Sequence, residues 1–406
     1  MSTTTMRPSV AFAGTAGIFA VFFLAAGAPT PLLGLRQQQW GFSAGLLTIA
    51  FSVYAVALLV ALLVGGSLSD HLGRRPVLLG ALVVETVSMV GFLLAPSIGW
   101  LIVARVLQGV ATGLGTSAFS AAIAEHAPAH LKKLAGGLSA ASVAGGLGLG
   151  ALLTGAAIQL TDSANTIVFA ALTALMLAAI VFVLATPETG VRRPGARRSL
   201  APTIAVPTAA RGEFLASIPV HVAGWMFPAF FLGLSPAVLR LHFGLHGGLV
   251  TGFTAFVGPF AAAVAGFVFA RHDPRRGTLL GLGLVLLGMI VVFAGVTATV
   301  LPLVWVGALL GGAGFGGTFG GQVRLIAPHA GAHQRASLFS AVYTVAYLAF
   351  GVPVVIAGQL APRWGLVPTF DSYAAVVVIL ALLGLAVQGA RAIRQGQESE
   401  TLTVLS

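Results

Sequence analysis

The sequence of 406 residues contains no cysteine and few charged residues, and both shortages limit what the protein can be. Without cysteine it has no disulfide, thiolate nucleophile or thiolate metal ligand. Charged residues make up 8% of the chain, whereas a water-soluble domain carries roughly a quarter. Hydrophobic residues make up 57% and the mean hydropathy is +1.00. We therefore expect a lipid bilayer to surround most of the chain.

The apolar residues fall into twelve runs, and a helix that crosses a membrane needs roughly 20 such residues. The first run is longer than the core of a signal peptide and leads into further apolar runs, so we expect an uncleaved span. The predicted fold class is an all-α membrane protein with twelve transmembrane helices. The runs lie near residues 11–35, 43–68, 77–95, 99–123, 134–160, 165–186, 214–239, 246–270, 277–298, 300–326, 335–360 and 371–391.

A polar stretch rich in proline and arginine separates the first six runs from the last six. Its composition is typical of a linker between two units. The predicted units are an N-terminal six-helix bundle at 1–186, a cytoplasmic linker at 187–213, a C-terminal six-helix bundle at 214–391 and a cytoplasmic tail at 392–406. A weak repeat supports two halves, because GGSLSDHLGRRP after the second run and AGFVFARHDPRR after the eighth lie 200 residues apart. In the second copy, Ala270 replaces the acid Asp70.

The basic residues predict the orientation in the membrane, because cytoplasmic loops carry an excess of lysine and arginine. With the amino terminus in the cytoplasm, seventeen basic residues fall at inside loops and only Arg36, Arg240 and Arg363 at outside loops. This asymmetry predicts a multi-pass protein of the cell inner (plasma) membrane with both termini in the cytoplasm. It also explains the net charge of +11, so we expect no nucleic-acid partner.

The loop GGSLSDHLGRRP, from Gly65 to Pro76, resembles the signature loop between the second and third spans of the major facilitator superfamily. The resemblance extends over essentially the whole chain and implies two pseudo-symmetric six-helix bundles and a monomer. It also implies that Asp70 braces the start of the eleventh span when the cavity opens outward. Arg74 would pair with an acid at the end of the fourth span, where Glu125 lies. The implied conformational-switch loop comprises Gly66, Asp70, Gly73, Arg74, Arg75 and Glu125.

Two further segments resemble the drug:proton antiporter branch of that superfamily. LIVARVLQGVATGLG, residues 101–115, matches the fourth-span motif of the branch through Arg105, Gln108, Gly109 and Gly113. SVAGGLGLGALLTG, residues 142–155, resembles its glycine-rich fifth span. The resemblance implies that Gly109, Gly113, Gly146 and Gly150 pack helices closely. The usual proline after the last glycine is Ala151 here, which favours transporters outside that branch.

Two charged residues lie inside predicted spans, where a charge is costly and marks a candidate functional group. Glu85 lies about 12 Å from the cytoplasmic surface, and Arg105 about 9 Å below the outer one, at 1.5 Å per residue. Their heights differ by about 9 Å, too far for an ordinary direct ion pair. Both are candidates for proton coupling. The alternatives are a neutral Glu85 that hydrogen-bonds between helices, and an Arg105 bound to backbone carbonyls or extended outward.

The resemblance places the first, fourth, seventh and tenth spans around a central cavity. The seventh span also contains Pro219, Pro228 and Pro236, which should bend or loosen it, and bent helices line cavities in transporters. Packing inside the bundle is the alternative role for each polar or aromatic side chain there. The candidates for contact with a substrate are Phe23, Gln108, His221, Trp225, Phe315 and Gln322.

The sequence contains no Walker loop, no nucleophile paired with a base and no cluster of metal ligands, so we expect no enzyme activity, no metal and no cofactor. The predicted function is a secondary active transporter that exports a small hydrophobic or amphipathic compound, by proton antiport with alternating access. The expected partners are the small-molecule substrate, protons and the lipid bilayer. One alternative is a facilitator or proton-coupled transporter of sugars or other metabolites. A more remote one is a membrane receptor or scaffold that transports nothing.

Overall fold

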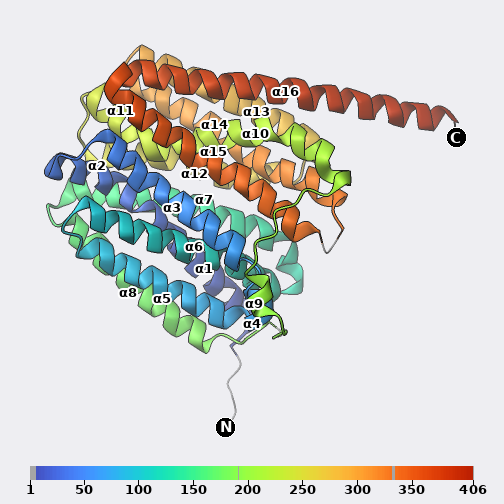
Figure 1. The fold of residues 1–406 in the computed structure, drawn as a ribbon, viewed down its shortest axis with the longest axis horizontal. Helices are drawn as coiled ribbons and strands as arrows, with labels where there is room; N and C mark the ends of the chain where they lie inside the picture. Colours follow the sequence, from blue (N-terminus) through green and yellow to red (C-terminus); the bar gives the residue numbers. More distant parts are fainter. Residues whose placement is uncertain (1–5, 191, 332–333, 406) are drawn as a thin grey trace, which may run out of the picture.

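The computed structural model describes residues 6–190, 192–331 and 334–405, and within these the chain is all-α with no strand (Figure 1). Residues 1–5 and 406, at the ends of the predicted first bundle and tail, lie outside the described residues. The first half contains α1 Pro8–Gly27, α2 Pro29–Trp40, α3 Ala44–Gly65, α4 Ser69–Leu72, α5 Arg74–Leu93, α6 Ile98–His126, α7 Lys132–Leu160 and α8 Ala164–Ala185. The linker contains α9 Ala196–Ser199. The second half contains α10 Arg211–Ala229, α11 Ser235–Leu241, α12 Gly248–Phe269, α13 Pro274–Thr297, α14 Leu301–Ile326, α15 Arg335–Trp364 and α16 Leu366–Leu405.

Twelve helical segments of the described chain are long and apolar enough to cross a membrane, which confirms the predicted fold class. Two of them are irregular beside prolines. The first segment passes from α1 into α2 at Ala28, just before Pro29. The seventh contains Pro219 and Pro228 inside α10, and a π-helical turn at Phe230–Leu234 separates α10 from α11. A proline cannot donate the backbone hydrogen bond of a regular helix, so such irregular turns are expected beside it.

Each half has its own apolar core. One core contains only residues between Phe12 and Val183. The other core consists mainly of residues from Val220 to Ala381, with a few residues of α3 and α7. In Figure 1 the helices of the first half lie together below those of the second. The exact boundaries of the two bundles at residues 186 and 213 stay a prediction.

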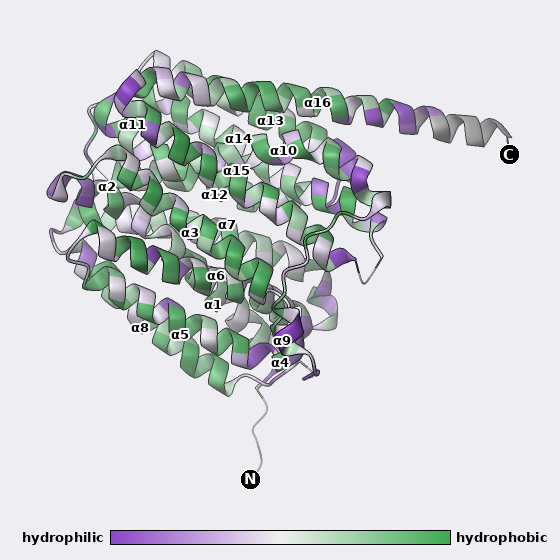
Figure 2. Cartoon of the chain, in the orientation of Figure 1, coloured by the Kyte–Doolittle hydropathy of each residue, from purple (hydrophilic) through white to green (hydrophobic). Residues whose placement is uncertain are grey.

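The long surfaces of the helices are apolar, and the hydrophilic residues gather at the helix ends (Figure 2). The 66–73 loop, the 186–210 linker and the far end of α16 lie at one end of the molecule, on the right in Figure 1. We call this end the linker face. The end that carries α2 and α11 is the opposite face. Because the apolar surfaces between the two faces would contact lipid, the protein is a multi-pass membrane protein.

The halves meet along two pairs of helices. Helices α7 and α12 approach so closely that a Cβ atom on Gly252 would collide with backbone atoms of Ala151 and Gly155. Helices α3 and α15 meet nearer the opposite face, where the Ser52 hydroxyl donates to the carbonyl of Gly351 at 3.1 Å. Small residues at such contacts allow helix backbones to pack directly in lipid.

Candidate functional site

A buried polar network lies inside the first half, and it contains both charges that the sequence placed within spans. Glu85 on α5 is 0% exposed and Arg105 on α6 is 1% exposed. Gln108 lies one helical turn from Arg105 and joins the two. Its carbonyl oxygen accepts from Arg105 Nη1 at 2.5 Å, and its amide donates to Glu85 Oε1 at 3.3 Å. The structure thus brings the two predicted proton-coupling candidates together through an amide, without a direct ion pair between them.

Arg105 satisfies most of its donors on the backbone. Its guanidinium donates to the carbonyls of Ala26, Ala50 and Phe51 at 3.3–3.5 Å. It also lies over the ring of Tyr54, with 4.5 Å from Cζ to the ring centroid. These carbonyl contacts match the alternative considered for Arg105, and the bond to Gln108 adds a link to an ionisable group. The arginine therefore holds α1, α3 and α6 around one buried charge.

Two polar atoms at the network have no partner among the described residues: Glu85 Oε2 and the hydroxyl of Tyr54. A buried polar atom without a hydrogen bond is unfavourable, so natural proteins keep few of them. The network therefore contains a buried carboxyl group with one free oxygen, at a fixed place between α5 and α6.

A second candidate site, which we call the aromatic pocket, lies inside the second half. Its walls come from α10 and α14, whose residues 315, 318, 319 and 322 recur at the spacing of one helix face. The ring of Trp225 lies 5.3 Å from that of Phe315 and 5.5 Å from that of Phe319, both edge to face. The lining residues are Val220, His221, Gly224, Trp225, Phe315, Thr318, Phe319 and Gln322.

The aromatic pocket contains four of the six predicted substrate contacts: His221, Trp225, Phe315 and Gln322. The other two lie elsewhere. Gln108 belongs to the buried polar network, and Phe23 packs edge to face on Phe19 inside the first core, 2% exposed. The resemblance could indicate which spans surround the cavity, but not which face of each helix points into it.

The predicted conformational-switch loop forms a network of ion pairs at the linker face. Arg74 pairs with Asp70 at 2.5 Å and with Glu125 at 2.9 Å. The second pair is the one that the family resemblance implies for the end of the fourth span. Asp70 is half exposed and pairs within its own loop in this conformation. Its expected role at the eleventh span stays a prediction.

The sequence analysis missed Glu188, which fastens the linker to this loop. Its carboxylate accepts from the backbone N–H of Arg74 at 2.8 Å and from that of Arg75 at 3.0 Å. These N–H groups open α5 and have no partner within the helix, so a carboxylate there acts as a cap and stabilises the helix dipole. Gly73, at φ +98°, leaves room for the carboxylate, which a Cβ would meet. Thr189 adds a hydroxyl bond to Glu125. An acid that follows a span directly is the only signal for this cap in the sequence.

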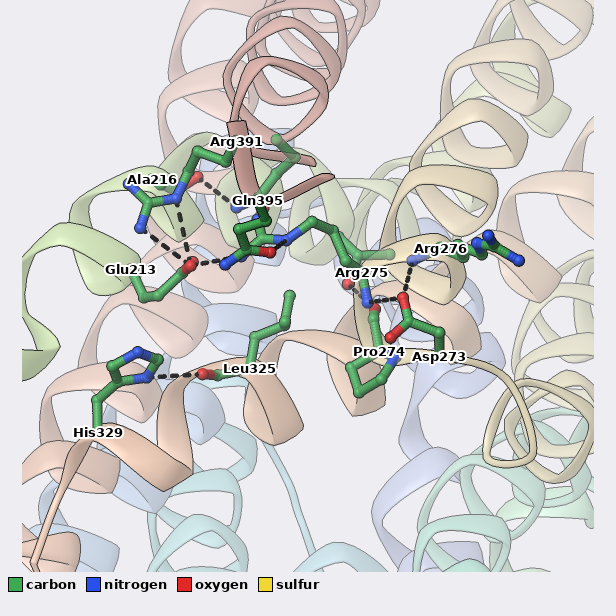
Figure 3. A network of polar contacts seen from close by, with 12 residues as sticks. Glu213, Ala216, Asp273, Pro274, Arg275, Arg276, Leu325, His329, Arg391 and Gln395 are labelled. Atoms are coloured by element: carbon green, nitrogen blue, oxygen red, sulfur yellow. Dashed lines mark hydrogen bonds and ion pairs between the residues drawn. The ribbon is translucent and has the colours of Figure 1, made fainter. Parts of the chain in front are cut away.

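A second missed cluster holds three helices of the second half together at the linker face (Figure 3). The Glu213 carboxylate on α10 accepts from Arg275 on α13 at 2.5 Å and from Arg391 on α16 at 2.9 Å. Arg275 also donates to Gln388 at 2.6 Å and to Gln395 at 3.0 Å. We call these five residues the Glu213 cluster. In the second repeat, where Ala270 stands in place of Asp70, Arg275 thus pairs with an acid from another helix.

The four glycines expected at helix contacts all lie where backbones meet. A Cβ at Gly109 or Gly113 would meet the backbone of α3, at the carbonyls of Tyr54 and Leu58. A Cβ at Gly146 or Gly150 would meet the backbone of α1. These contacts fix α6 against α3 and α7 against α1, and α6 thereby holds Arg105 and Gln108 in place.

Comparison with known proteins agrees with this architecture. One relative is the multi-drug resistance efflux pump PmrA of Streptococcus pneumoniae serotype 4, 39% identical over 116 residues, or 28% of each chain. Another is the PmrA homolog of Lactococcus lactis subsp. lactis, 33% identical over 159 residues, or 38% of this chain and 39% of that one. The matched segments thus span well under half of either relative.

Solved structures share the fold at low identity. A bacterial homolog of the human lysosomal transporter Spinster, in an inward-facing and unoccupied conformation, superposes with a TM-score of 0.75 and 14% identity. The match covers 95% of this chain and 98% of that one. The human organic anion transporter MFSD10 gives a TM-score of 0.65 at 17% identity over 94% of this chain and 100% of that one. The family model of the Major Facilitator Superfamily matches residues 15–354, and the chain therefore belongs to this superfamily of membrane transporters.

Proposed function

We propose that the protein is a secondary active exporter of small hydrophobic or amphipathic compounds, driven by proton antiport with alternating access. Three features support the proposal: the buried carboxyl of Glu85, the aromatic pocket and the two efflux-pump relatives. The linker face would be cytoplasmic, in agreement with the excess of basic residues at that end.

The observation that carries the proposal is the burial of Glu85 beside Gln108 and Arg105. An ionised carboxylate without water needs partners that stabilise its charge. Gln108 supplies one hydrogen bond, and Arg105 contributes at longer range. Release of the proton is therefore expected to require a change in the helices around the network. A proton that leaves only in one conformation is what an antiporter needs.

The contacts between the halves indicate how the conformation could change. At the opposite face, Arg240 donates to the carbonyl of Gly34 at 3.1 Å and to Gln37 at 2.5 Å. The Ser52 bond to Gly351 lies on the same side of the molecule. These bonds would close the outer side while the inner side admits substrate from the cytoplasm. Alternating access would break them and close the linker face instead.

The aromatic pocket would hold the transported compound. Its apolar rings suit a hydrophobic or amphipathic molecule, and a few polar atoms give it orientation. Because pocket and network lie in different halves, protonation would influence the substrate through the relative position of the halves. Tyr347, which packs against both apolar cores and lies 5.1 Å from the Trp225 ring, is placed to transmit such a movement.

The proposal is tested in two steps. A comparison of toxic aromatic compounds on cells with and without the protein identifies an exported compound. The purified protein is then reconstituted in proteoliposomes with a pH dye inside, and the compound is added under a proton gradient. We expect the compound to collapse part of the gradient, and Glu85→Gln to abolish this proton movement.

Asp162→Asn is the control, because Asp162 is an exposed acid between two spans and lies outside the buried polar network. It should leave proton movement unchanged. Flux of the compound without proton movement, and unchanged counterflow in Glu85→Gln, would overturn the coupling and identify a facilitator. No flux of any compound would point to a membrane receptor or scaffold.

A further inference from the structure

The aromatic pocket contains an unusual set of buried polar atoms without hydrogen-bond partners among the described residues. Both polar atoms of the Gln322 amide lack a hydrogen-bond partner among the described residues, and so do Trp225 Nε1 and His221 Nε2. Gln322 is 0% exposed and His221 4% exposed. Buried polar groups are normally paired, because an unpaired one loses its bonds to water without replacement. All three residues line the same pocket.

The hydrogen-bonding character of each atom can be assigned. The Trp225 indole can only donate, and the Gln322 amide both donates and accepts. His221 Nδ1 lies 3.0 Å from the carbonyl of Ser217, which can only accept, so Nδ1 carries a hydrogen. In a neutral ring Nε2 is then an acceptor. The pocket therefore offers at least two donors and two acceptors within walls that are otherwise apolar.

The charge of the lining argues against an ionic ligand. None of the eight lining residues is an aspartate, glutamate, lysine or arginine. A carboxylate ligand would find no cation, and an ammonium ligand would find no acid. Aromatic rings can bind a cation through their faces, but Trp225 already meets Phe315, Phe319 and Phe350 edge to face at 84–88°. These rings pair with one another rather than form an open cage.

The shape of the pocket favours a flat occupant. The ring centroids of Phe315 and Phe319 are 6.2 Å apart, and the two ring planes are at 16° to each other. The lining side chains leave almost no free space between them in this conformation, so an occupant must displace some of them. A planar ring can enter between aromatic side chains with less rearrangement than a bulky saturated ring, and it gains edge-to-face and stacking contacts there.

We propose that the aromatic pocket is a binding site for uncharged, planar aromatic compounds that carry both a hydrogen-bond donor and an acceptor, such as an aromatic carboxamide. The proposal rests on the proposed export function, because it specifies the substrate class. The amide of the ligand pairs with that of Gln322, donor to acceptor and acceptor to donor. Trp225 and His221 supply a further donor and acceptor.

Ligand-observed saturation-transfer NMR on the full-length protein in lipid nanodiscs tests the proposal, because the method detects weak binding. The probes are benzamide, benzoate, benzyltrimethylammonium and cyclohexanecarboxamide. They differ in charge or planarity around one scaffold. Benzamide should bind most tightly. Gln322→Leu should weaken it about tenfold, the effect of one or two lost hydrogen bonds.

Gln159→Leu makes the same change at an exposed position outside the pocket and should leave binding unchanged. Trp225→Phe keeps a ring and removes only the N–H, so it should weaken benzamide less than Gln322→Leu does. Benzyltrimethylammonium or benzoate binding as tightly as benzamide would overturn the proposal, as would equal binding of cyclohexanecarboxamide. Unchanged benzamide binding in Gln322→Leu would do the same. Binding is measured without a proton gradient, so its failure is distinct from a failure of proton antiport.

Discussion

The Glu213 cluster allows a quantitative test of how a buried ion pair stabilises the second half. Glu213 is 3% exposed and the Arg275 side chain 7%, whereas the Arg391 side chain is 35% exposed. Removing one partner of a buried pair costs roughly 3–5 kcal/mol, because the other charge stays behind without compensation. Glu213→Gln leaves Arg275 with two neutral acceptors, Gln388 and Gln395. We therefore expect Glu213→Gln to lower the free energy of unfolding by about 3 kcal/mol, near the lower end of this range.

Substitutions of the two arginines of the cluster should lower the free energy of unfolding by less. Arg391 is partly solvated, so Arg391→Gln should cost about 1 kcal/mol or less. Arg275→Met leaves Glu213 with Arg391 as its counter-ion and should fall between these values. The double variant Glu213→Gln/Arg275→Met removes both buried charges. It should cost clearly less than the sum of its two single changes, since no isolated charge remains.

The assay is equilibrium unfolding of the purified protein in mixed detergent micelles, followed by the fluorescence of its five tryptophans. Arg394→Gln, at an exposed position on the same helix as Arg391, is the control and should have little effect. Additive costs of the two single variants would refute the reasoning. So would a loss below about 1 kcal/mol in Glu213→Gln, because the pair would then behave like a solvated one.

Two further predictions concern the linker and the contact between halves. Glu188→Ala removes a helix cap worth about 1 kcal/mol, so it should raise the rate of hydrogen–deuterium exchange at the first amides of α5 about fivefold. Asp162→Ala, at an exposed acid, should leave this rate unchanged. Equal exchange rates in the two variants would contradict the cap. Gly252→Ala should destabilise the α7–α12 contact by about 1–3 kcal/mol, measured by the same unfolding assay. Gly283→Ala, with open space around its Cα, is the control, and equal losses would contradict a tight contact.

Much of the fold could be predicted because lipid imposes a simple rule on the sequence. A span must be about 20 apolar residues long, so twelve runs predict twelve helices and their approximate ends. The irregularity at Ala28 and the π-helical turn at Phe230–Leu234 were harder to predict from the sequence. Prolines mark where a helix can be irregular, but the packing around them decides which turn forms.

The buried polar network was predictable in part. From the heights of Glu85 and Arg105 we expected no ordinary direct pair, and in the structure Gln108 connects the two side chains. Gln108 is three residues from Arg105 and therefore on the same helix face, about one turn closer to Glu85. This spacing allows Gln108 to connect Arg105 with Glu85. Whether the connection forms depends on the rotation of α6 relative to α5. In uniformly apolar spans the sequence does not specify this rotation.

The Glu213 cluster was missed for a different reason. Comparison of the two repeats showed only that Ala270 replaces the acid Asp70, and it did not indicate an acid that pairs with Arg275. The acid comes instead from α10, 62 residues earlier in the chain. Such long-range compensation has no local pattern. By contrast, His221 and Trp225 are four residues apart, and Phe315 and Gln322 are seven apart, so each pair could be assigned to one helix face.

The contact that Arg240 makes at the opposite face has a consequence for the response to ionic strength. Its two acceptors, the Gly34 carbonyl and the Gln37 amide, are neutral, so no ion pair needs to be broken there. The linker face, in contrast, contains the ion pairs of Arg74 with Asp70 and Glu125. Dissolved salt screens exposed pairs of opposite charge far more than bonds to neutral oxygens. Added electrolyte on the linker side should therefore alter the rate of switching more than the same addition on the other side.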